Sequence, residues 1–129
     1  MGVTFLPYLS IIAIITLRKM HKLLIPIYDI PLFIHIGYPL EPTRKKYNID
    51  PGLDAVAAVH EIEGALLVWF HPTEFIPSLV AHEVIHLKNL IFTHVSFKQD
   101  PSNDEAEAYL VEYLVKEIEK VYKKHNQSK

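Results

Sequence analysis

The stretch that decides the fold is residues 77–92, which read PSLVAHEVIHLKNLIF. Its apolar residues recur at three- and four-residue steps, which predicts an amphipathic helix. The pattern runs through Ile76, Leu79, Val80, Glu83, Val84, Leu87, Leu90 and Ile91. Pro77 suits the helix entrance, where a missing backbone N–H has little effect on stability. The sequence therefore predicts a helix from about Pro77 to Phe92.

Within that helix, residues 82–86 form an H-E-x-x-H motif. Two histidines four residues apart lie on one helix face, close enough for both imidazoles to bind one metal ion. Glu83 points into the same space and can take a proton from a zinc-activated water. The motif therefore predicts that His82 and His86 bind Zn²⁺ and that Glu83 is the general base. The alternative is a pair of hydrogen-bonded histidines beside a surface carboxylate.

A catalytic zinc ion takes three ligands from the protein and one water, so a third protein ligand is expected. An Asp-Pro pair at the start of residues 100–125 predicts a second long helix there. Glu105, in its first turn, is the first candidate for the third ligand, and Glu107 and Asp104 are alternatives. An acidic residue at a helix start also stabilises the helix dipole without binding a metal.

Together these two helices resemble the core of gluzincin-type zincins, which are zinc peptidases. In several such families the third ligand is a glutamate in an E-x-x-A-(D/N/Y) pattern, and residues 105–109, EAEAY, match it. The segments HEVIH and NDEAEAYLVEYL also resemble short metallopeptidase-like proteins encoded by phages. The resemblance covers residues 65–116. It implies a peptidase with His82, His86 and Glu105 as zinc ligands.

Other positions indicate which subtype of zincin the chain resembles. A metzincin would require glycine at position 89 and histidine at position 92, where this chain has Asn89 and Phe92. Tyr109 stands where an acidic or amide residue often follows the alanine, which leaves open what orients the ligand histidines. Stabilising the transition state of peptide hydrolysis needs a hydrogen-bond donor near the developing oxyanion. Tyr109 is the candidate donor, with Tyr113 as an alternative, and both side chains also fit as core aromatics.

The segments before the motif helix predict a small antiparallel sheet. Strand-like runs occupy residues 23–29, 32–38, 54–60 and 65–70, and a turn at 61–64 predicts a hairpin. The predicted fold class is therefore α+β, a small antiparallel sheet followed by the H-E-x-x-H helix and a long C-terminal helix. Such a minimal zincin-like core binds extended peptides along an edge strand, for which residues 65–70 are the candidate. Trp69, Phe70 and His71 would line the cleft; alternatively, Trp69 and Phe70 belong to the sheet core.

Composition limits the class of protein. A chain of 129 residues, half of them hydrophobic, with net charge −2 suggests one globular domain. Its C-terminal lysines alternate with glutamates, which is typical of a solvated helix face, so no nucleic-acid partner is expected. The absence of cysteine excludes disulfides and cysteine-ligated zinc. It also fits a reducing cytoplasm, that of the host if the chain is viral.

The N-terminal segment has an unusual composition. Residues 5–17 are almost continuously apolar, but the run is shorter than the roughly 20 residues that span a bilayer. It also lacks the basic leader of a signal peptide. It is a membrane-associating segment, a buried element, or an extension upstream of a natural start at Met20. We favour the extension over membrane contact, and expect residues 20–129 to form a single zincin-like metallopeptidase domain.

The leading functional hypothesis is a zinc-dependent peptidase acting on a peptide or protein, with Glu83 as general base. The alternative is a zinc-stabilised, non-catalytic protein that binds a host or partner protein. A third hypothesis is a metal-free interaction module in which the histidines are incidental. The sequence predicts neither the cleavage specificity nor the oligomeric state.

Overall fold

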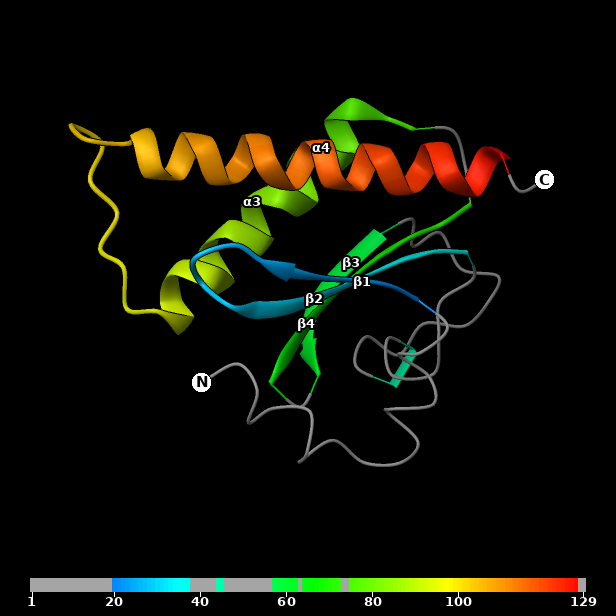
Figure 1. Cartoon of the computed structure of the whole chain (residues 1–129), viewed down its shortest axis with the longest axis horizontal. Helices are drawn as coiled ribbons and strands as arrows, with labels where there is room; N and C mark the ends of the chain where they lie inside the picture. Colours follow the sequence, from blue (N-terminus) through cyan, green and yellow to red (C-terminus); the bar gives the residue numbers. More distant parts are fainter. Residues whose placement is uncertain (1–19, 38–43, 46–56, 63, 73–74, 128–129) are drawn as a thin grey trace. The chain divides into compact units, whose positions relative to one another are not determined.

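The computed structural model of the chain describes residues 20–37, 44–45, 57–62, 64–72 and 75–127. The chain divides into two compact units, Met1–Thr73 and Glu74–Lys129, which we call the sheet unit and the helical unit. Figure 1 traces their elements in chain order. The order is four strands and then two helices, so the predicted α+β class is confirmed. The predicted extension and its apolar run at residues 5–17 lie outside the described residues.

The sheet unit contains one four-stranded sheet. Its strands are β1 (His21–Ile25), β2 (Ile30–Ile36), β3 (Ala57–Ile62) and β4 (Ala65–Phe70), arranged in the order β1-β2-β4-β3. The pairs β1/β2 and β3/β4 are antiparallel, as expected of strands joined by short connections. However, β2 and β4 are parallel, with Leu32 opposite Leu66. The sheet is therefore mixed, and the prediction of a wholly antiparallel sheet is wrong at this pairing.

Strand β4 is an inner strand of this sheet. All six of its residues are buried, and it hydrogen-bonds to β2 on one side and β3 on the other. A continuous apolar run of this length is consistent with a strand covered on both faces. The prediction that residues 65–70 form a peptide-binding edge strand is therefore wrong, because both edges of β4 are already paired.

Trp69 and Phe70 are core residues of the sheet unit. Both side chains are buried, and the Trp69 indole N–H donates a hydrogen bond of 2.6 Å to the Gly37 carbonyl. Such a bond satisfies the one polar group of a buried tryptophan. His71 follows β4 and is half-buried. The core interpretation of Trp69 and Phe70 is thus confirmed over the cleft-lining one.

The helical unit begins with α3 (Pro77–His94), which contains the whole H-E-x-x-H motif. Proline occupies its first turn, as the sequence predicts. Two backbone hydrogen bonds close its C-terminus, Val95 N–H to Ile91 and Ser96 N–H to Thr93. Ser96 has a left-handed φ of 57°, which turns the chain away from the helix axis. The motif therefore lies in the middle of a regular helix.

Helix α4 (Glu105–Gln127) begins later than the sequence predicts. The Asp100 carboxylate accepts a 2.9 Å hydrogen bond from the Ser102 N–H, and its carbonyl accepts one of 2.9 Å from the Asn103 N–H. Pro101 therefore lies in a turn rather than at the first position of the helix. An aspartate that bonds the backbone two residues on favours such turns as readily as helix caps.

Helices α3 and α4 contact each other along their apolar faces. The buried residues of α3 are Val80, Glu83, Val84, Leu87, Lys88, Ile91 and Phe92, and those of α4 are Leu110, Leu114, Ile118, Val121 and Tyr122. The Tyr122 ring also meets the Phe75 ring edge-on, with centroids 5.4 Å apart. Within the part of the chain that the structure describes, no helix is long and apolar enough to cross a membrane.

Candidate metal site

The two motif histidines converge on the exposed face of α3. Their Nε2 atoms lie 3.3 Å apart, and their ring centroids are separated by 5.0 Å. Two nitrogens bound tetrahedrally to zinc at about 2.0–2.1 Å lie about 3.3 Å from each other. The same distance also fits a hydrogen bond between one protonated and one bare ring nitrogen. The pair therefore has the spacing of two zinc ligands without any rearrangement.

Glu83 lies beside this pair but is turned inward. Its side chain is only 8% exposed, and its Oε2 atom lies 3.9 Å from the His82 Nε2. Burial raises the pKa of the Glu83 carboxyl, while the nearby His82 and His86 act in the opposite direction. A largely buried carboxylate next to two imidazoles is a chemically suitable proton acceptor. Glu83 is thus not a surface carboxylate.

Glu105 lies on the exposed side of the first turn of α4. Residues two apart in a helix point about 200° apart, so Glu105 and Glu107 face nearly opposite directions. It is Glu107 that turns toward α3. Among the described residues, no three histidine, aspartate or glutamate side chains are grouped closely enough to hold a metal ion. The structure therefore brings His82, Glu83 and His86 together without Glu105, whose role as third ligand stays a prediction.

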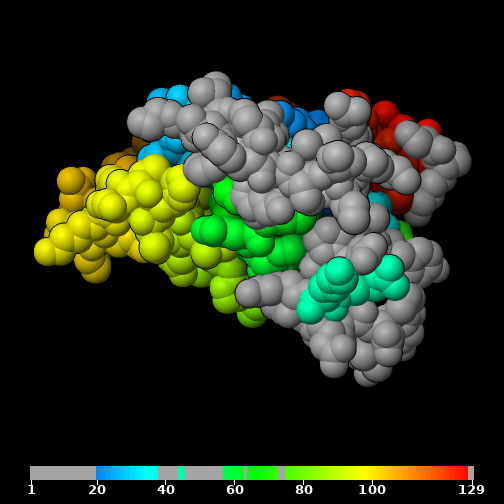
Figure 2. Space-filling model, turned by 90° about the horizontal axis from the view of Figure 1, so that it is seen from below, coloured from blue at the N-terminus to red at the C-terminus, as the bar shows by residue number. Residues whose placement is uncertain are grey.

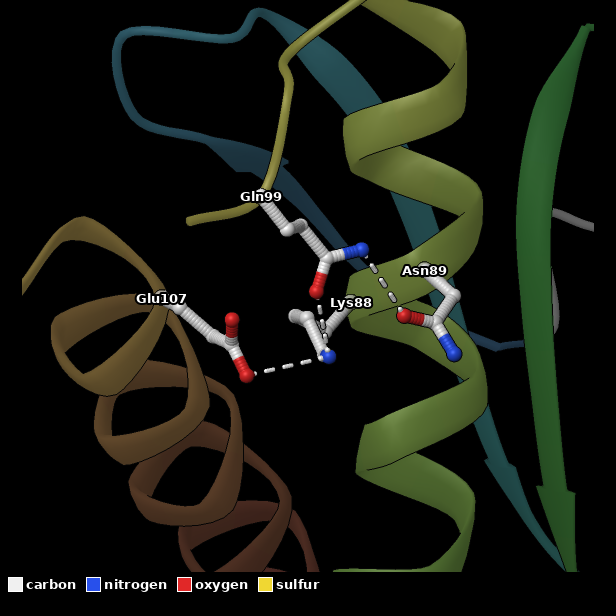
Figure 3. Close-up of polar contacts among 4 residues, drawn as sticks. All are labelled: Lys88, Asn89, Gln99 and Glu107. Atoms are coloured by element: carbon white, nitrogen blue, oxygen red, sulfur yellow. Dashed lines mark hydrogen bonds and ion pairs between the residues drawn. The ribbon is translucent and has the colours of Figure 1, made fainter. Parts of the chain in front are cut away.

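Glu107 is the ion-pair partner of Lys88, as Figure 3 shows. The Lys88 Nζ atom lies 3.2 Å from Glu107 Oε1 and donates a 2.9 Å hydrogen bond to Gln99 Oε1. Gln99 in turn donates through Nε2 to Asn89 Oδ1 at 3.2 Å. The Lys88 side chain is only 7% exposed, so these oxygens compensate a nearly buried charge. We call these four residues the Lys88 network.

The buried Lys88 lies outside the H-E-x-x-H motif, although its position in the helix pattern is a signal for it. Val84, Lys88 and Ile91 follow the i, i+4, i+7 spacing of the buried face, and all three are buried. A lysine at such a position needs a carboxylate from a neighbouring element, and Glu107 supplies it. The alternative third ligand Glu107 is therefore engaged in an ion pair, while Asp104 is exposed.

The connector between the helices, residues 95–104, is exposed along its whole length and coloured yellow to orange in Figure 2. Besides Gln99, it is held by Phe97. The Phe97 ring stacks on Phe92 with centroids 4.4 Å apart, and its backbone N–H donates to the Phe92 carbonyl at 2.8 Å. These contacts hold the start of α4 near the C-terminal half of α3.

The two candidate oxyanion donors lie further along α4. Tyr109, one turn after Glu105, is strongly exposed, so its interpretation as a core aromatic is wrong. Tyr113 is partly buried, and this burial, reinforced by Glu117, raises the pKa of its hydroxyl, while Lys120 lowers it. A donor role for either tyrosine stays a prediction.

Comparisons with known proteins identify no relative. No protein-family model matches the chain, and neither a curated protein nor a solved structure matches it. The likeness to gluzincins therefore rests on the motif residues 82–86 and 105–109. The chemistry of the site must be argued from its own geometry.

Proposed function

We propose that this chain is a zinc-dependent peptidase whose ion is bound by His82 and His86. The observation that carries the proposal is the 3.3 Å separation of their Nε2 atoms, with the buried Glu83 carboxylate 3.9 Å from one of them. Hydrogen-bonded surface histidines would not require a buried acid beside them. An acid with a raised pKa next to a zinc-ligand pair is the arrangement that metal-assisted hydrolysis uses.

A bound zinc ion would polarise the substrate carbonyl and make a water more acidic. Glu83 would accept the proton of the attacking water and pass it to the leaving amine. The proton comes from the water, the C–N bond breaks, and the amine leaves neutral. The low exposure of Glu83 keeps bulk water from competing for that proton. The proposed substrate is a peptide or protein, and the proposed location is the cytoplasm.

Glu105 remains the proposed third ligand, on the strength of the E-x-x-A-Y match at residues 105–109. For Glu105 to bind the ion, the face of the first turn of α4 that carries Glu105 must point toward the histidine pair, in place of the face that carries Glu107. Tyr109, one turn later, is the proposed oxyanion donor on that same face. Zinc affinity separates the candidates: Glu105→Gln should weaken binding at least about tenfold, and Glu107→Gln should not.

The test of the proposed function combines zinc content with turnover. Untagged protein purified without chelator and then supplied with excess zinc should bind near one zinc per chain and hydrolyse members of a peptide library. Glu83→Gln should keep the zinc and lose at least about 100-fold in kcat. His86→Ala should lose zinc, whereas the matched control His94→Ala, on the same helix, should keep it. Full activity in Glu83→Gln would refute the assigned mechanism.

A second candidate function is a zinc-stabilised binding protein. It is favoured by one observation, namely that the described residues bring no third ligand to the histidine pair. Such a protein would bind zinc and be stabilised by it, yet Glu83→Gln would leave partner binding unchanged. Finding neither bound zinc nor thermal stabilisation by added zinc would remove both candidates and favour a metal-free interaction module.

A further inference from the structure

The exposed face of α3 carries no fixed charge. Its exposed residues are Pro77, Ser78, Ala81, His82, Ile85, His86, Asn89, Thr93 and His94. The two formally charged residues of the helix, Glu83 and Lys88, are both buried. Water-facing helix surfaces ordinarily carry lysine and glutamate. An outward face of neutral side chains around two converging histidines is therefore suited to contact with another molecule.

The histidine pair supplies half of a tetrahedral zinc site. Its Nε2 atoms have the spacing of two ligands, and zinc takes four. No third ligand accompanies them among the described residues. A two-fold axis through the ion would place the same two histidines of a second copy on the other side. Two incomplete sites would then become one complete site of four imidazoles.

We propose that two copies of this chain associate through α3, with one zinc ion shared by His82 and His86 of each. This inference rests on zinc binding at those histidines in the proposed function. Four imidazoles leave no open position for water, so the dimer is a resting form without hydrolytic activity. The catalytic and dimeric forms use the same histidines and exclude each other.

Ile85 suits the centre of such an interface. It lies between the two histidines in sequence, is 44% exposed, and belongs to the same outward face. Two copies meeting there would bring isoleucine against isoleucine, with no like charges opposed. Because one helix face buries little area, the association should depend on the metal. By contrast, the outward face of α4 carries Glu112, Lys116 and Lys120 and would resist such close contact.

The experiment is sedimentation of the untagged full chain during titration with zinc chloride, with magnesium chloride as the control salt. The mass should double from 14.9 kDa, reach its maximum at half an equivalent of zinc, and return on adding EDTA. Magnesium should have no effect, because it prefers oxygen ligands. His86→Ala should lose the dimer, and the matched control His94→Ala should retain it.

A second variant keeps the proposal testable if the histidine substitution disturbs the helix. Ile85→Glu leaves both histidines in place but opposes two carboxylates across the axis, so it should lose the dimer and still bind zinc. Zinc bound one to one by a chain that stays monomeric would overturn the dimer and support the proposed function. A dimer that forms equally without zinc would also overturn it. Zinc-dependent dimers without peptide hydrolysis at any zinc level would support the dimer and refute the peptidase.

Discussion

Helices α3 and α4 pack on each other but distribute their charges in opposite ways. In α4 the buried residues are all uncharged, and its lysines and glutamates form exposed or partly exposed pairs such as Lys116–Glu112 at 3.0 Å. In α3 the two charged side chains, Glu83 and Lys88, are buried, and the exposed residues carry no fixed charge. Helix α4 is therefore an ordinary amphipathic helix, whereas the distribution of charge in α3 is not the one that favours stability in water.

The two buried charges of α3 also differ from each other. Lys88 is compensated by Glu107 and Gln99, so it contributes to the contact between the helices. Glu83 lies beside His82 and His86, which partly offset the rise in its pKa that burial causes. A buried acid with a raised pKa lowers the free energy of unfolding, and residues that lower stability in this manner are characteristic of functional sites. Four substitutions test this contrast.

The largest effect should come from the inward face of α3. Leu87 is fully buried, so Leu87→Ala should lower the free energy of unfolding by about 3 kcal/mol through lost packing and a residual cavity. Ile85→Ala, two residues away on the outward face, should change it by less than about 0.5 kcal/mol. Urea denaturation in EDTA measures both. Equal losses would mean that the outward face is packed as well.

Breaking the Lys88 network should have the next largest effect. Glu107→Gln leaves a nearly buried ammonium without its carboxylate and should cost about 1–3 kcal/mol, less than a fully buried pair because Glu107 is 33% exposed. The matched control is Glu112→Gln, which breaks an exposed pair on the same helix and should cost about 0.5 kcal/mol or less. Similar losses in the two variants would contradict the assignment of Lys88 as a buried ion-pair partner.

Glu83→Gln should stabilise the metal-free protein near neutral pH. Because burial raises the folded-state pKa of Glu83 above its unfolded value, the ionised carboxylate disfavours folding once the pH exceeds that value. The uncharged amide removes that penalty. Thermal unfolding in EDTA measures the change, with the more exposed Glu119→Gln as control. A destabilised Glu83→Gln would show that the carboxylate supports the fold.

The smallest effect should come from the connector. Phe97→Ala removes the stack on Phe92 and should cost about 1 kcal/mol. It should also speed amide hydrogen exchange in residues 95–104 more than in the middle of α3. Val95→Ala is the control, because it changes the connector without touching the stack. Unchanged exchange in Phe97→Ala would mean that the Lys88 network alone fixes the connector.

Much of the fold follows from sequence periodicity. The bounds of α3 and β4 agree closely with the apolar patterns at residues 77–92 and 65–70, because burial of one face, or of both, determines those patterns. Strand direction does not follow in the same way. Strands β2 and β4 are apolar almost throughout, which is consistent with burial on both faces but does not fix the direction of a neighbouring strand, so their parallel pairing was not predicted.

The candidate site was predictable to the extent that it is local. His82, Glu83 and His86 share one helix, so their spacing fixes their geometry. Glu105 and Tyr109 were assigned from a pattern on another helix, whose rotation depends on tertiary contacts such as Lys88–Glu107. A helix pattern shows which residues share a face but not which neighbour that face meets.

The parallel register between β2 and β4 also has a kinetic consequence. Each antiparallel pair closes locally, Ile25 opposite Ile30 and Ile62 opposite Ala65, and hairpins of this kind form in about 1–10 μs. Pairing Leu32 with Leu66 instead closes a much longer loop, and the chain loses this loop-closure entropy before the stabilising contacts form. The sheet unit should therefore fold by forming two hairpins early and joining them last. Substitutions at the β2/β4 seam should then act mainly on the unfolding rate, and those within either hairpin on the folding rate.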